Sequence, residues 1–190
     1  MGRWFDGFRC ALPILLIAGV AQAADIAGVR IDDAAKVGGS DLVLNGAGVR
    51  SKFFVKVYVG ALYAAQKATT PAAIYDSPAP RRMLLRMMRD LEAKKLQEAL
   101  DEGLRNNLSA AELAAAGEAI EQLGKLFQSI GKAREGDVIT LDFSQQGVAI
   151  GFNNAPRGTV GDAAFARALL RVWLGDEPAD AGLKKALLGG

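Results

Sequence analysis

Residues 42–63 read LVLNGAGVRSKFFVKVYVGALY, and this stretch carries a long β-strand pattern. From Lys52 to Ala64 the odd positions are apolar without a break, whereas the even positions mix polar and apolar side chains. One face of this strand is therefore expected to pack on a core, and the other to meet more polar surroundings. The dipeptide Asn45-Gly46 is expected to form a turn before it, because Asn-Gly accommodates the positive φ angles of tight turns.

Strand and helix patterns alternate through the rest of the chain. Arg82–Arg89 predicts a strand, and Asp90 is expected to cap the helix after it. A capping box of Ser109 with Glu112 predicts the start of a second helix that packs on the first. The remaining elements expected are strands at residues 25–32 and 41–44, a hairpin of 137–143 with 148–152, a helix from Asp162 that ends at Gly175, and a short helix at 183–188.

The order of these elements predicts the fold class. Strands come first, followed by two helices, a hairpin and further helices. The economical arrangement is α+β, an antiparallel sheet with a helical layer on one face. Residues 24–190 are enough for one domain with a full core.

The first 23 residues have the features of a secretory signal peptide. Arg3 and Arg9 precede and flank the apolar run ALPILLIAGV, and Ala21-Gln22-Ala23 has the small-x-small pattern of a cleavage site. The apolar run is about half the roughly 20 residues that cross a bilayer. The expected division is a signal peptide at 1–23 and an exported, periplasmic domain at 24–190 without a transmembrane segment. An uncleaved anchor is the alternative, which the small residues at the cleavage site disfavour.

Composition excludes several kinds of chemistry. The chain has no His, and its one Cys, Cys10, lies in the expected signal peptide. The mature domain would therefore lack disulfides, a thiol nucleophile, a Ser-His-Asp triad and a His or Cys metal site. Loss of the leader would change 23 basic and 21 acidic residues to 21 and 20, a net charge of +1. This near balance argues against a nucleic acid partner, and no cofactor or metal is expected.

The segment at 42–63 resembles the chalcone isomerase family, whose members carry a G-x-G-x-R turn followed by a strand that ends in a small residue, an aliphatic residue and a tyrosine. Weaker resemblance continues, in order, through RMLLRMMRDLEAKKLQEALDEGL, GDVITLDFSQQGVAIGF and FARALLRVWLGDEPADAGLKKALLG. The resemblance implies an open-faced β-sandwich, in which a large antiparallel sheet carries a helical layer. This agrees with the fold class predicted from the order of the elements.

The resemblance also implies a ligand site. Arg50 matches the family arginine that meets the ligand's anionic group, and Tyr58 stands where the fatty-acid binders carry a tyrosine and the isomerases a threonine. On the helix where the isomerases place a tyrosine, a lysine and an asparagine, the aligned residues are Leu96, Ala99 and Gly103. Without that polar network, an enolate would lack stabilisation. An arginine and a tyrosine over an apolar cleft suit a carboxylate with an aliphatic tail.

Three functions follow as expectations. The first is a protein that binds a fatty acid or a similar amphipathic carboxylate and is not a catalyst. The second is a cofactor-independent isomerase, an intramolecular lyase that closes a ring with Arg50 stabilising the anion and Tyr58 donating a proton. The third is a structural or interaction module without a small ligand. The oligomeric state is not predicted.

A cluster of basic residues begins directly after Pro80. Acidic residues interrupt it, and alternate strand positions face opposite ways, so the cluster is expected to be a solvated face rather than a docking patch. Its members are Arg81, Arg82, Arg86, Arg89, Lys94 and Lys95.

Overall fold

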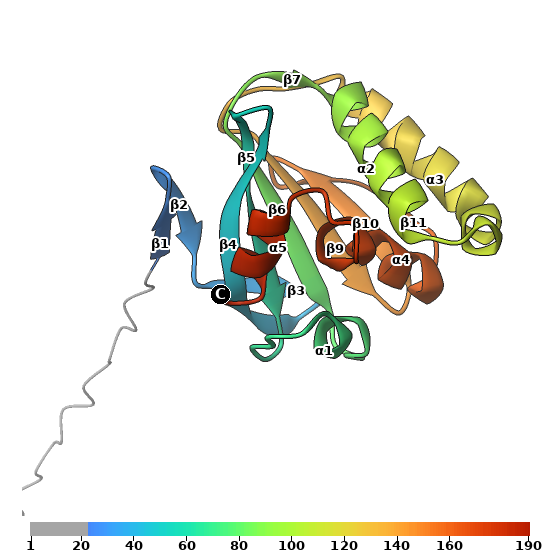
Figure 1. Cartoon of the computed structure of the whole chain (residues 1–190), viewed down its shortest axis with the longest axis horizontal. Helices are drawn as coiled ribbons and strands as arrows, with labels where there is room; N and C mark the ends of the chain where they lie inside the picture. Colours follow the sequence, from blue (N-terminus) through green and yellow to red (C-terminus); the bar gives the residue numbers. More distant parts are fainter. Residues whose placement is uncertain (1–22) are drawn as a thin grey trace, which may run out of the picture.

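A computed structural model describes residues 23–190, and the central feature of this part is a seven-stranded antiparallel sheet (Figure 1). The expected signal peptide, up to residue 22, lies outside the described residues. The strand order is β11-β10-β9-β6-β5-β4-β3. The strands are β3 (Ala34–Val37), β4 (Ser40–Lys52), β5 (Val55–Ala64), β6 (Arg81–Met87), β9 (Val138–Ser144), β10 (Gly147–Phe152) and β11 (Ala155–Val160).

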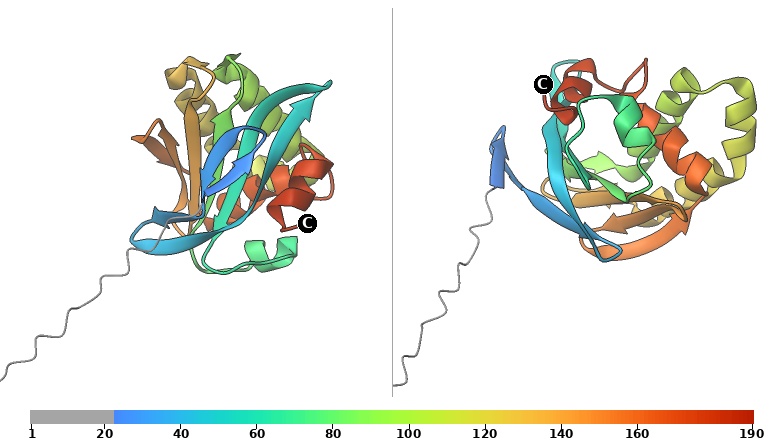
Figure 2. Two further views of the ribbon diagram at one scale, coloured as in Figure 1. Left: turned by 90° about the vertical axis from the view of Figure 1, so that its left-hand side faces the viewer. Right: turned by 90° about the horizontal axis from the view of Figure 1, so that it is seen from below.

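Helices cover one face of this sheet. The sheet curls, and the helices lie on its inner side (Figure 2). They bury one large apolar core that includes Phe127, Phe143 and Trp173. The α+β arrangement predicted from the sequence is confirmed. The helices are α1 (Pro71–Tyr75), α2 (Ala93–Asn107), α3 (Ala110–Ile130), α4 (Ala163–Leu174) and α5 (Ala181–Leu187). Among residues 23–190, none of these helices is long and apolar enough to cross a membrane.

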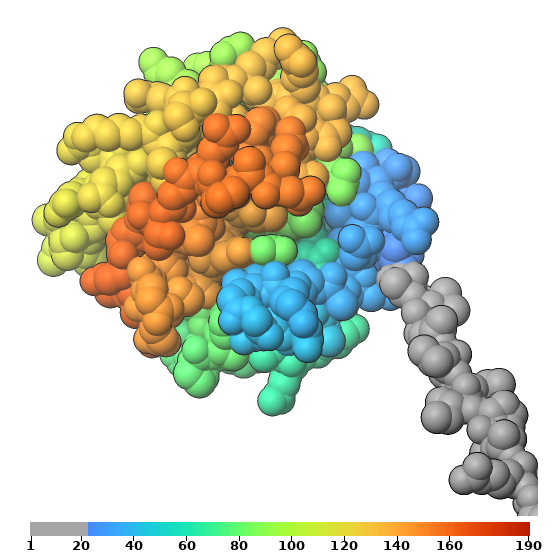
Figure 3. All heavy atoms as spheres, turned by 180° about the vertical axis from the view of Figure 1, so that it is seen from behind, coloured from blue at the N-terminus to red at the C-terminus, as the bar shows by residue number. Residues whose placement is uncertain are grey.

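The opposite face of the sheet carries a second apolar cluster. A hairpin of β1 (Ala23–Ile26) and β2 (Val29–Asp32) packs on it through Ile31, and Figure 3 views the molecule from this side. A two-stranded ribbon of β7 (Leu91–Glu92) and β8 (Lys132–Ala133) joins the ends of α2 and α3. Because both sheet faces are covered, every residue from Val57 to Ala64 is buried. The expectation that one face of this strand meets polar surroundings is therefore wrong.

The Asn45-Gly46 turn is a second wrong prediction. Both residues lie inside β4, where the pairing with β5 shifts register between Leu44 and Gly46. The Asn45 amide donates to the carbonyls of Ala68 and Leu187, and its carbonyl accepts from the Ala68 N–H. Asn45 thus ties β4 to the C-terminal helix across a β-bulge. The turn itself is formed by Phe53 and Phe54, so β5 begins at Val55.

Helix α5 packs directly on glycines of β4 and β5. A Cβ atom on Gly46 would lie 2.0 Å from the Ala186 carbonyl oxygen, and one on Gly48 would lie 2.7 Å from the Ala186 Cβ. Gly60, which pairs with Gly48, faces Leu183 of the same helix. The G-x-G pair therefore belongs to a strand rather than a turn, and its role is to admit a helix close to the sheet.

Helix starts were predicted with mixed success. The Ser109–Glu112 capping box and the Asp162 cap are both formed, and the 138–152 hairpin is confirmed. Asp90 does not cap α2: it accepts from the Glu135 N–H and pairs with Lys132, while Glu92 occupies the N-cap. Strand β11, which is largely exposed, was not predicted.

The basic cluster is only partly solvated. Arg81 is buried on the helical side of β6 and donates to the carbonyls of Ser77 and Ala79. Arg82 is half-buried on the other side and forms a bidentate pair with Asp142, at 2.6 Å for each bond. The alternation of β6 separates the two arginines, as the period of a strand requires.

Candidate functional site

Arg50 and Tyr58 are brought together by strand pairing. They are register partners on β4 and β5, and both point to the helical side of the sheet. The Arg50 Cζ atom lies 5.6 Å from the centre of the Tyr58 ring, within the range of a cation–π contact. Only 8% of Arg50 and 3% of Tyr58 is exposed. The two residues singled out in the sequence therefore form one buried pair.

The Arg50 guanidinium forms no ion pair in the described part of the chain. Its Nε atom is buried without a hydrogen-bond partner, and none of the ion pairs of residues 23–190 includes it. Asp180, whose charge acts on Tyr58, accepts from the N–H groups of Ser51 and Leu183. A buried cation without a partner is costly. Arg50 is thus a feature that packing alone does not explain.

Tyr58 is held in place by a hydrogen bond from Trp173 of α4. The Trp173 Nε1–H of α4 donates to the Tyr58 hydroxyl oxygen at 2.9 Å. Burial raises the pKa of the Tyr58 phenol, opposed by the charge of Arg50 and by the bond from Trp173. A neutral phenol that accepts one hydrogen bond can still donate its own proton to a ligand. The missed role of Trp173 had no local sign in the sequence, because Trp173 and Tyr58 are 115 residues apart.

Replacement of Tyr58 by Phe is expected to lower the free energy of unfolding by about 1–3 kcal/mol, because the buried Trp173 N–H would lose its acceptor. Urea unfolding followed by circular dichroism measures this loss. The Trp173→Phe variant and the double variant complete a thermodynamic cycle. Fully additive losses in this cycle would contradict a hydrogen bond between the two side chains.

A small cavity lies next to this pair. Its volume is about 10 Å³, which corresponds to about one water molecule. Of the three helix residues expected at the ligand site, Leu96 and Ala99 line this cavity, whereas Gly103 lies elsewhere on α2, where a Cβ would be 2.8 Å from Val172 Cγ1. Gly103 thus allows α2 and α4 to pack closely. The other lining residues are Leu85, Leu100, Phe127, Val172 and Ala179.

An open groove of about 420 Å³ adjoins the cavity. Arg50 and Ala99 line both spaces, so they lie at the boundary between them. The groove runs between the end of the β4–β5 hairpin and α2. Its further lining residues are Lys52, Phe53, Val55, Val57, Arg89, Leu91, Lys95, Glu98 and Glu102. The volume falls within the range of small-molecule sites, about 300–1,000 Å³.

A larger groove lies away from Arg50, between α3 and α4, with a volume of about 560 Å³. Its arginines, Arg167 and Arg171, pair with Asp76 and Glu112. Arg86 resembles Arg50 in having a buried Nε without a partner, but it lies on the other side of β6 and lines neither of the spaces next to Arg50. Within residues 23–190, no cluster of three or more potential ligands could hold a metal ion. The groove that ends at Arg50 is therefore the better candidate for an anionic ligand.

Comparisons with known proteins agree with the fold. A crystal structure of a fatty-acid binding protein from Arabidopsis thaliana is similar, with a TM-score of 0.66, 16% identity, and coverage of 88% of this chain and 96% of that chain. No curated protein matches the sequence. The family model described as chalcone isomerase-like matches residues 23–189. The chain therefore belongs to the chalcone isomerase-like family.

Proposed function

We propose that this protein binds a fatty acid or a similar amphipathic carboxylate in the periplasm and does not convert it chemically. The observation that carries the proposal is Arg50, a buried cation that lines an open groove and forms no ion pair among the described residues. A ligand carboxylate would supply the opposite charge and accept paired N–H donors from the guanidinium. The neutral Tyr58 hydroxyl beside it can donate one more bond.

The aliphatic part of the ligand has two places to lie. In this conformation it would follow the groove, along Val55, Val57 and Leu91. The inner cavity is too small for an acyl chain, so occupation of the core would require Phe127 or Leu100 to move. The fatty-acid binding activity of the similar Arabidopsis protein supports the same ligand class.

The other two parts of the proposal rest on the sequence. The signal-peptide features of residues 1–23 support export to the periplasm. The apolar residues Leu96, Ala99 and Gly103, where isomerases carry polar groups, support binding without catalysis. Turnover of a chalcone above its spontaneous rate would contradict the second part, and full-length protein that stays in the cytoplasmic fraction would contradict the first.

Replacement of Arg50 by Met is expected to weaken dodecanoate binding by about 10- to 100-fold, because a hydrogen bond to a charged group contributes about 1.5–3 kcal/mol. Calorimetry with the protein purified after expression of the full chain measures the affinity, and native mass spectrometry of the same preparation detects a co-purified lipid. Dodecanol, which lacks the carboxylate, should bind wild type more weakly than dodecanoate does.

The matched control is Lys52→Met, which removes an exposed cation of the same groove. Lys52 lies 4.0 Å from Glu102 and contacts solvent, so its loss is expected to change the affinity by less than about threefold. Equal losses in the two variants would mean that the groove attracts anions in general. The absence of any bound lipid, together with no binding of dodecanoate by wild type, would overturn the proposed function.

A further inference from the structure

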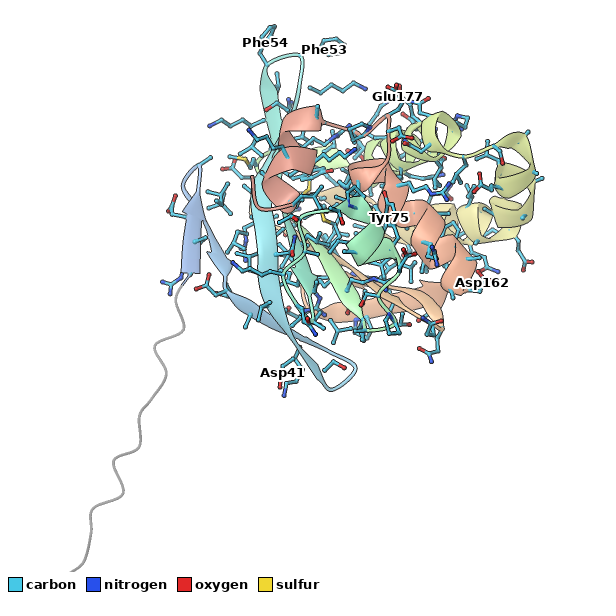
Figure 4. The ribbon with its side chains drawn as sticks, turned by 60° about the horizontal axis from the view of Figure 1, so that its bottom comes forward. Asp41, Phe53, Phe54, Tyr75, Asp162 and Glu177 are labelled. Atoms are coloured by element: carbon cyan, nitrogen blue, oxygen red, sulfur yellow. The ribbon has the colours of Figure 1, made fainter. Side chains whose placement is uncertain are left out.

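The tip of the β4–β5 hairpin exposes two adjacent phenylalanines. Phe53 is 86% exposed and Phe54 is fully exposed, and both side chains project beyond the end of the hairpin (Figure 4). Val55, the next residue, is also an exposed large apolar side chain. A contiguous apolar projection of this kind is unusual on a protein surface, and it marks a site of interaction with another apolar surface.

The backbone conformation of this turn does not favour phenylalanine. Phe53 and Phe54 form the two-residue loop between Lys52 and Val55, with φ angles of 50° and 65°. These are the signs of a type I′ turn, in which Asn and Gly are favoured because bulky residues are strained at positive φ. The turn therefore holds two aromatic side chains at a conformational cost.

The same molecule provides an internal comparison. In the described part, three other two-residue hairpin loops have positive φ at both positions, and they contain Ala27-Gly28, Gly38-Gly39 and Asn153-Asn154. Gly or Asn occupies five of these six positions, and the exception is Ala27, which has a small side chain. Only the hairpin next to the Arg50 groove replaces both residues with Phe. The difference is specific to this hairpin. Packing in the core does not account for it, because neither ring is buried.

Charge around the tip indicates what kind of surface it meets. Lys52 precedes the two phenylalanines and Lys56 follows them, both exposed. The adjoining groove is lined by more cations than carboxylates. The four cationic residues are Arg50, Lys52, Arg89 and Lys95, and the two carboxylates are Glu98 and Glu102. Aromatic side chains flanked by lysines suit the interface of an anionic bilayer, where the rings enter the acyl boundary and the ammonium groups meet phosphates.

We propose that the Phe53-Phe54 tip inserts into the surface of an anionic phospholipid membrane. Insertion would place the mouth of the groove at the level of the lipid headgroups, since Phe53 and Val55 belong to both the tip and the groove lining. An amphipathic molecule leaving the bilayer would then reach Arg50 without crossing bulk water. Membrane docking itself depends on the tip and not on Arg50, so it can be tested independently of ligand binding.

The test is vesicle flotation with protein purified after expression of the full chain. Wild type should float with vesicles of phosphatidylglycerol and phosphatidylcholine, more weakly with phosphatidylcholine alone, and less as salt is raised. The Phe53→Asn, Phe54→Gly double variant should lose binding by about tenfold or more, because it removes the apolar side chains that insert. The same variant should melt about 2–4 °C higher, because Asn-Gly suits the turn.

Two controls separate the proposal from its competitors. Val43→Ser removes an exposed apolar side chain, 41% exposed, at the far end of β4 and should keep vesicle binding. Arg50→Met should also keep it, even where dodecanoate binding is lost. Wild type that fails to float, or a double variant that floats as well as wild type, would overturn the proposal. Wild-type dimers in light scattering that the double variant abolishes, without vesicle binding, would identify a second copy as the occupant and overturn it too.

Discussion

Replacement of Phe127 by Ala is expected to lower the free energy of unfolding by about 3–5 kcal/mol, which is the usual range for removing a buried phenylalanine. Phe127 is fully buried in α3 and lines the small cavity next to Arg50 and Tyr58. Besides Ala179, the other residues that line the cavity come from five different elements, β4, β5, β6, α2 and α4, so the site cannot collapse around the lost ring without moving helices. Urea unfolding followed by circular dichroism measures the change.

The same variant has a functional consequence. Loss of the Phe127 ring would enlarge the cavity, now about 10 Å³, into a much larger apolar space. Arg50 would lie at the polar end of this space. Dodecanoate should then stabilise the variant more than it stabilises wild type, because a ligand that fills the cavity binds only the folded state. Dodecanol is the matched probe for the apolar part alone. A variant that loses little stability, or that gains no more from dodecanoate than wild type does, would contradict this account of the cavity.

Replacement of Gly46 by Val is expected to lower the free energy of unfolding by about 3 kcal/mol, at the upper end of overpacking effects. The first carbon of the new side chain would lie 2.0 Å from the Ala186 carbonyl oxygen and 2.8 Å from that of Leu187. Both are backbone atoms, so no rotamer change relieves the clash. Helix α5 would have to move away from β4.

The control for Gly46 is Gly117→Ala on α3, where an added Cβ meets nothing within 4 Å. That substitution should raise stability slightly, because Ala is the better helix former. Hydrogen exchange locates the effect of Gly46→Val: amides of α5 should lose more protection than those of α3. Unchanged protection of α5 would show that its contact with Gly46 is not tight.

Local chemistry made a large part of the fold predictable. The capping box at Ser109 and Glu112 and the cap at Asp162 were predicted correctly, because a cap depends on residues three positions apart. The hairpin of β9 and β10 was predicted from its alternation. The antiparallel sheet and its helical layer followed from the order of the elements along the chain, and the similar Arabidopsis structure has the same fold.

Predictions failed where distant segments compete with local preference. Asn45-Gly46 favours a turn by itself, but Asn45 gains three hydrogen bonds to Ala68 and Leu187 inside β4. Phe53-Phe54 disfavours a turn by itself, yet the pairing of β4 with β5 places the turn there. Asp90 has the chemistry of an N-cap, but Lys132 and the Glu135 N–H engage it instead.

The candidate site, too, was predictable only in part from the sequence. Arg50 and Tyr58 could be identified from the residues and their family resemblance, because both lie in one segment of the chain. Three features required the folded structure: the unpaired Nε of Arg50, the Trp173 bond to Tyr58, and the groove between β4–β5 and α2. Periodicity, caps and composition act over a few residues and are readable in the chain itself. Burial, ion pairing and cavities depend on which distant segments meet, and only tertiary packing decides that.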